Sequence, residues 1–77
     1  MKIQVREIKK GDIFTESGIT NVVVDLTYNN YVNGTEIVII TTEALKYNKK
    51  YFGDMKPTKG GFGYYTKKLT TSISVQR

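Results

Sequence analysis

Apolar and polar residues alternate along most of this 77-residue chain, and this period of two constrains its fold more than any other feature. The alternation is visible at Ile3 and Val5 and recurs in residues 12–16, 22–28 and 69–75. Because successive side chains of a strand point to opposite faces, such a pattern predicts strands with one buried face. A further strand is expected over 35–41, and the chain is too short for a second core. We therefore predict one all-β domain over residues 1–77, a small five-stranded barrel or sandwich.

Short turn motifs separate the predicted strands. Lys9-Lys10-Gly11-Asp12 and Ser17-Gly18 each contain a glycine, which adopts positive φ at little cost. Asn33-Gly34 is the strongest local signal, because a type I′ hairpin turn requires positive φ at both central residues. These motifs predict antiparallel strands joined by short connections.

The two longest apolar stretches predict how the inner strands are used. Val22, Val24, Leu26 and Tyr28 are expected to share one face of their strand. The run Ile37-Val38-Ile39-Ile40 is apolar on both faces. It predicts either a central strand covered on both sides or a face that forms a homo-oligomer.

The segment after this run predicts a change of structure. Residues 41–47 begin with threonines and carry Glu43 in their first turn, which favours a single helical turn. Residues 48–63 contain an asparagine, a proline and four glycines, so most of them are expected to form a long loop. A loop of this length in so small a domain is typical of a functional or a disordered segment.

Positive charge is concentrated in the second part of the chain. Residues 1–45 carry four basic and six acidic side chains, whereas residues 46–77 carry eight basic side chains and one acidic side chain. Such asymmetry within one domain indicates an anionic partner, although exposed lysines also keep loops soluble.

Residues 46–68 combine seven of the lysines with six of the nine aromatic residues. Single-stranded nucleic acid is bound by this pairing, because cations follow the phosphates while flat rings stack on unpaired bases. The alternative interpretation is that the rings belong to the core and the lysines only contact solvent. The residues predicted to contact nucleic acid or another anionic partner are Lys49, Lys50, Lys59, Phe62, Tyr64, Tyr65, Lys67 and Lys68.

Two short motifs resemble those of known families. Lys59-Gly60-Gly61-Phe62-Gly63-Tyr64-Tyr65 is similar to the basic-Gly-aromatic signature of RNA-recognition-motif and cold-shock domains, with an additional glycine and with Lys67 at the last aromatic position. Ile8-Lys9-Lys10-Gly11-Asp12-Ile13-Phe14 resembles the first strand-turn-strand unit of Src-homology-3-like and KOW barrels. The second resemblance supports a small barrel, and we expect a fold of the Src-homology-3-like or OB-like kind.

The chemistry that most enzymes need is missing from the composition. The chain has no cysteine and no histidine, so it offers neither the usual nucleophile–base pairs nor the usual zinc ligands. Its acids are scattered singly, and no phosphate-binding loop of the Walker or dinucleotide type is present. We therefore predict a protein that is not an enzyme and that holds no metal or cofactor.

Hydropathy and cysteine content suggest where the chain works. No apolar run approaches the roughly 20 residues that a membrane-spanning helix needs, and the first residues alternate unlike a signal peptide. The absence of cysteine fits a reducing compartment. A cytoplasmic location without a membrane partner is expected.

These observations predict a binding module that acts on nucleic acid through residues 46–68. The alternative function is a small protein-interaction factor, such as an inhibitor, an accessory protein or an assembly subunit of the kind that phages and mobile elements encode. Such a factor would bind a protein partner or assemble through the strand from Ile37 to Ile40.

Overall fold

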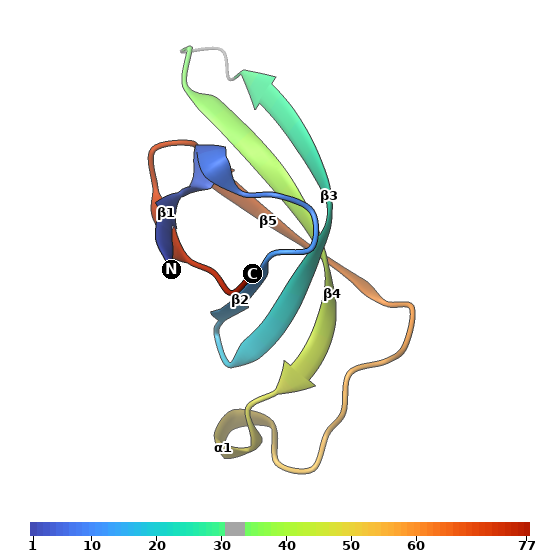
Figure 1. Ribbon diagram of the computed structural model, residues 1–77. Coiled ribbons are helices and arrows are strands. Elements are labelled where there is room, and N and C mark those ends of the chain that lie inside the picture. The colour runs from blue at the N-terminus through green and yellow to red at the C-terminus, as the bar shows by residue number, and fades with distance from the viewer. Residues whose placement is uncertain (31–33) are drawn as a thin grey trace.

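The computed structural model describes residues 1–30 and 34–77, which form a mostly β domain with two sheets (Figure 1). The larger sheet is an antiparallel meander in the order β2-β3-β4-β5, and the smaller sheet pairs β1 with β6. The strands are β1 (Lys2–Gln4), β2 (Ile13–Glu16), β3 (Ile19–Asn30), β4 (Glu36–Tyr47), β5 (Phe62–Lys68) and β6 (Ser72–Ser74). A 3-10 helix, η1 (Val5–Glu7), and one short helix, α1 (Lys49–Phe52), are also present.

The prediction of a mostly β domain is confirmed, but its details differ. The described residues hold six strands instead of five, and two short helical segments instead of at most one. The strands form two sheets, which meet where Ile13 and Gln76 exchange backbone hydrogen bonds of 3.0 and 2.7 Å. The terminal ammonium of Met1 donates to the Val75 carbonyl at 3.0 Å, and Figure 1 shows the N and C marks on the same side of the larger sheet.

The predicted turn at Ser17-Gly18 is confirmed. Both residues have positive φ, 51° for Ser17 and 78° for Gly18, as a type I′ hairpin turn requires. The predicted turn before β2 is also present, because the Asp12 N–H donates to the Lys9 carbonyl and the Lys9 N–H donates to the Asp12 carboxylate. In the predicted Asn33-Gly34 turn, Gly34 has a φ of 80°, while Asn33 lies outside the described residues.

A β-bulge at Val24 changes which side of β3 faces the core. The register with β4 shifts at this position, where β3 holds one residue more than its neighbour. Before the bulge Val23 is buried, whereas after it Leu26 packs against the core. The prediction that Val22 and Val24 share one face with Leu26 and Tyr28 is therefore wrong, because the extra residue reverses the alternation.

The helical turn predicted at residues 41–47 is also wrong. Strand β4 continues to Tyr47, because these residues have pairing partners on neighbouring strands. Thr42, for example, lies between Val23 of β3 and Gly63 of β5. A ladder paired on both sides supplies more hydrogen bonds than an isolated helical turn. The helix begins only after Asn48.

Strand β5 was not expected, since its first residues were assigned to the long loop. Gly63 does not mark a turn there. It lies opposite Thr42, and a Cβ atom at this position would be 3.2 Å from the Thr42 hydroxyl oxygen. Glycine therefore allows a close approach of two strands. The strand predicted over 69–75 is correspondingly interrupted by a turn after Lys68 and reduced to β6.

The core takes side chains from both sheets. Its buried members are Val5, Ile8, Phe14, Val23, Val38, Ile40 and Val75, and Tyr65 and Ile73 are among the half-buried residues that pack against it. Strand β4 crosses the middle of the larger sheet, with β3 on one side and β5 on the other. Three residues of the apolar run, Ile37, Val38 and Ile40, are buried, which favours the first of its two interpretations, a covered central strand.

Candidate functional site

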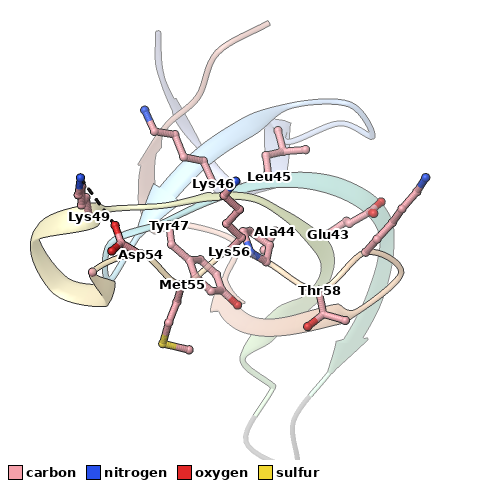
Figure 2. Close-up of a pocket in the computed structure, with 13 residues that line it drawn as sticks. Glu43, Ala44, Leu45, Lys46, Tyr47, Lys49, Asp54, Met55, Lys56 and Thr58 are labelled. Carbon is pink, nitrogen blue, oxygen red and sulfur yellow. Dashed lines mark ion pairs between the residues drawn. The ribbon is translucent and has the colours of Figure 1, made fainter.

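An open groove of about 630 Å³ lies at the end of β4 that leads into α1 (Figure 2). Residues 43–47 of β4 form one wall, and Lys49 with residues 53–59 of the following loop forms the other. Figure 1 shows this loop extending from the sheet at the end opposite to residues 30 and 34. The groove therefore lies between the end of β4 and the loop that follows α1.

Short-range contacts place α1 at this end of β4. The Asn48 side chain caps the helix by accepting a backbone N–H at 2.9 Å, and Gly53 ends it with a φ of 61°. The rings of Tyr47 and Phe52 pack with their centroids 4.6 Å apart. Gly18 lies against the same helix, since a Cβ atom there would be 2.8 Å from the Tyr51 ring. Strand, turn and helix together fix the start of the loop.

Four lysines and two acids line the groove. The acids are Glu43 and Asp54, and the lysines are Lys46, Lys49, Lys56 and Lys59. Asp54 pairs with Lys49 at 3.7 Å, but both side chains are at least 85% exposed, so this ion pair stabilises the loop little. In the described part of the chain, no carboxylate pairs with the other three lysines. The groove therefore carries a net positive charge.

Two aromatic rings lie beside the groove on the outer face of the larger sheet. Phe62 is 58% exposed and Tyr64 is 69% exposed, because alternation along β5 turns both rings away from the core. Phe62 is paired across the strands with Glu43, which is also a groove residue. Phe62 is therefore a neighbour of the lysine-lined groove, and Tyr64 lies two residues further along the same face of β5, opposite Thr41.

Tyr65 points to the opposite face of β5 and belongs to the core. Its ring packs edge-on against Phe14 with a centroid distance of 5.4 Å. Its hydroxyl accepts a hydrogen bond of 3.3 Å from the Asn21 side chain, which itself accepts one of 3.1 Å from the buried Thr42 hydroxyl. This network makes Tyr65 a structural residue.

Lys67 shares the inner face with Tyr65 and forms an ion pair with Glu16 of β2. Both side chains are partly buried, so the ammonium group is held within the domain. Lys68 lies on the outer face but at the other end of β5, opposite Ile37. Neither lysine lines the groove.

The eight predicted contact residues therefore divide into separate groups. Lys49 and Lys59 line the groove, Phe62 and Tyr64 are exposed beside it, and Lys50 is exposed on α1. Tyr65, Lys67 and Lys68 do not join them.

Two further lysines, Lys46 and Lys56, belong to the groove and were not selected from the sequence. Both lie within the basic segment, so the charge count contained this signal. Alternation alone, however, cannot show which lysines a returning loop brings together.

Among residues 1–30 and 34–77, no helix is long and apolar enough to cross a membrane. The same residues contain no group of three acidic side chains that could hold a metal ion.

Comparisons with protein-family models, with curated proteins and with solved structures find no match for this chain.

Proposed function

We propose that this domain binds single-stranded nucleic acid at the lysine-lined groove and the adjacent outer face of β5. The observation that carries the proposal is the meeting of four lysines in one groove with two exposed aromatic rings beside it. In this arrangement the ammonium groups contact phosphates, and Phe62 and Tyr64 stack on bases.

The charge distribution supports a polyanion as the ligand. Lys46, Lys56 and Lys59 are exposed, and no ion pair holds them elsewhere among the described residues. Their charges are therefore available to phosphates, whose binding releases condensed counterions. Lysine contacts of this type hold a nucleic-acid backbone without reading its sequence.

The geometry of β5 supports a single strand as the form of the ligand. Phe62 and Tyr64 are two residues apart on one face, which places them about 7 Å apart along the strand. Rings exposed on a sheet can stack only on bases that are not already stacked in a duplex. We therefore expect preference for single-stranded over duplex oligonucleotides.

Replacing three groove lysines is expected to weaken binding and to reduce its salt dependence. The variant carries Lys46→Gln, Lys56→Gln and Lys59→Gln. A plot of log affinity against log salt concentration has a negative slope. Loss of three phosphate contacts should make this slope less steep by about 2 for a single strand. Fluorescence anisotropy with a labelled oligothymidine, titrated at several salt concentrations, measures both quantities.

A matched control removes the same charge from another surface. Lys2, Lys9 and Lys10 are exposed and lie outside the groove. Replacing all three with glutamine should therefore change the affinity, and the slope of log affinity against log salt concentration, much less than the groove variant does. Equal losses in the two triple variants would mean that net charge alone drives binding, and the groove would be rejected as the site.

Removing one exposed ring should weaken binding at every salt concentration. Tyr64→Ala is expected to lower affinity about 5- to 150-fold, the equivalent of roughly 1–3 kcal/mol for one stacked base. The same titration with Tyr28→Ala is the control, since Tyr28 is also an exposed tyrosine but does not line the groove. An unchanged affinity for Tyr64→Ala would remove stacking from the proposal.

We propose that the domain is related in shape to small barrels of the Src-homology-3-like or OB-like kind. The joins between its two sheets support this idea, since the Val5 N–H donates to the Thr71 carbonyl at 2.8 Å and the Arg6 N–H donates to the Leu69 carbonyl at 3.0 Å. These bonds connect η1, which directly follows β1, to the chain that leaves β5.

A protein-interaction factor is the second candidate function. The observation that favours it is the edge of β5, which among residues 1–30 and 34–77 is paired with β4 alone and does not line the groove.

A further inference from the structure

Strand β5 lies at the edge of the larger sheet, and β4 is its only paired neighbour among residues 1–30 and 34–77. The Leu69 N–H, one residue beyond the strand, donates to the Glu36 carbonyl of β4. Because backbone groups alternate in direction along a strand, those of Phe62, Tyr64 and Thr66 point away from β4. The outer edge of β5 therefore presents N–H and C=O groups that another strand can pair with.

The features that usually protect an edge are few on β5. Its register with β4 runs without a shift from Phe62 to Lys68, so no bulge twists the edge away, and the strand contains no proline. Its only charged residues are the two lysines at its C-terminal end, and Lys67 already pairs with Glu16. Most of the edge is open to pairing.

We propose that the partner at this edge is a second copy of the chain, paired antiparallel β5 to β5 about a twofold axis at Tyr65. This register pairs the whole strand with itself. Tyr64 and the partner's Thr66 then exchange both of their outward backbone hydrogen bonds, and symmetry repeats the pair. The two four-stranded sheets become one continuous sheet.

Side chains on the outer face are complementary in this register. The aromatic end of β5 meets the basic end of the partner strand, so Phe62 lies opposite the partner's Lys68. Glu43 follows on the other side of Phe62 in the same cross-strand row. Each row therefore contains an acid, a ring and a base, an order that favours a cation–π contact and avoids like charges.

One cross-strand pair on the inner face is free of side-chain crowding in this register. Gly63 lies opposite the partner's Lys67 and has no side chain to obstruct it. The pairing uses backbone edges, so the exposed rings of Phe62 and Tyr64 remain accessible on the outer face. This inference therefore does not depend on the proposed nucleic-acid site, and it is tested without nucleic acid.

Sedimentation velocity of the full chain tests the proposal. From about 10 µM to about 1 mM, we expect a reversible monomer–dimer equilibrium, since an interface this small binds weakly. Phe62→Lys places two ammonium groups opposite each other in both rows and should raise the dimer Kd roughly tenfold. Tyr28→Lys makes the same charge change away from β5 and should leave the Kd unchanged.

A charge reversal tests the register itself. Adding Lys68→Glu to Phe62→Lys restores opposite charges in both rows and should return the Kd to near its original value. Thr66→Pro removes an outward N–H but none of the bonds to β4, so it should abolish the dimer while the circular-dichroism spectrum stays β-rich.

Three results would each overturn the proposal: a monomer at every concentration, no recovery in the charge-reversed variant, or a dimer that survives Thr66→Pro with its fold intact. A strictly monomeric chain that still binds oligothymidine would reject this interface and leave the groove proposal standing. A dimer that binds no oligothymidine would reject the groove proposal and leave this interface standing.

Discussion

Replacing Ile40 with alanine is expected to lower the free energy of unfolding by about 2–5 kcal/mol. Ile40 is fully buried in the middle of β4, where it belongs to the core cluster that both sheets share. Alanine would lose the transfer free energy of the removed methyl groups and leave a cavity beneath three paired strands. The total free energy of unfolding of a domain of this size is only about 4–12 kcal/mol, so the variant should be close to unfolding.

Urea denaturation followed by circular dichroism measures this effect. Ile39→Ala is the matched control, because it removes the same atoms from the adjacent, half-buried position of the same strand. The loss of unfolding free energy in Ile39→Ala should be clearly smaller than in Ile40→Ala. The slope of the unfolding free energy against urea concentration should be the same in both variants. Equal losses at the two positions would contradict the assignment of Ile40 to the centre of the core.

Replacing Arg77 with glutamine is expected to cost about 1–3 kcal/mol of stability. Asp12 is buried, and its carboxylate accepts from the Arg77 guanidinium at 3.0 and 3.3 Å and from the Lys9 N–H at 2.9 Å. Without Arg77 the carboxylate keeps only the backbone donor. The expected loss is smaller than for a fully buried ion pair, because the Arg77 side chain is 33% exposed.

Arg6→Gln is the control for Arg77→Gln. It removes the same charge from an exposed side chain of η1, so the thermal midpoint should change little. Arg77→Lys should recover only part of the lost stability, since an ammonium group cannot reproduce the bidentate contact of the guanidinium with the Asp12 carboxylate. A midpoint unchanged in Arg77→Gln would mean that water replaces the arginine at no cost.

Much of the architecture follows from local sequence rules. Alternation predicts the β class, and Ser17-Gly18 predicts its turn, because strand periodicity and positive φ are properties of a few neighbouring residues. The bulge at Val24 could not be predicted, since it depends on how many residues the partner strand supplies. Strand β5 was missed for a similar reason, because its glycine serves a contact with Thr42 across the sheet.

The sequence predicts eight contact residues within one segment, and the structure does not bring all eight together. Composition points to residues 46–68, of which Lys49 and Lys59 line the groove. The pairing of Lys67 with Glu16 and the packing of Tyr65 on Phe14 depend on which face of β5 is inward. That choice is made by the register with β4, which no local pattern in the sequence specifies.

The pairing of β1 with β6 has a consequence for how this domain forms during translation. Lys2 is paired with Ser74, so β1 finds its partner only when β6 is available. The meander from β2 to β5 uses shorter separations and can assemble earlier. During synthesis, β1 would therefore lack its partner strand, with the core open on that side, until residues 72–74 have left the ribosome.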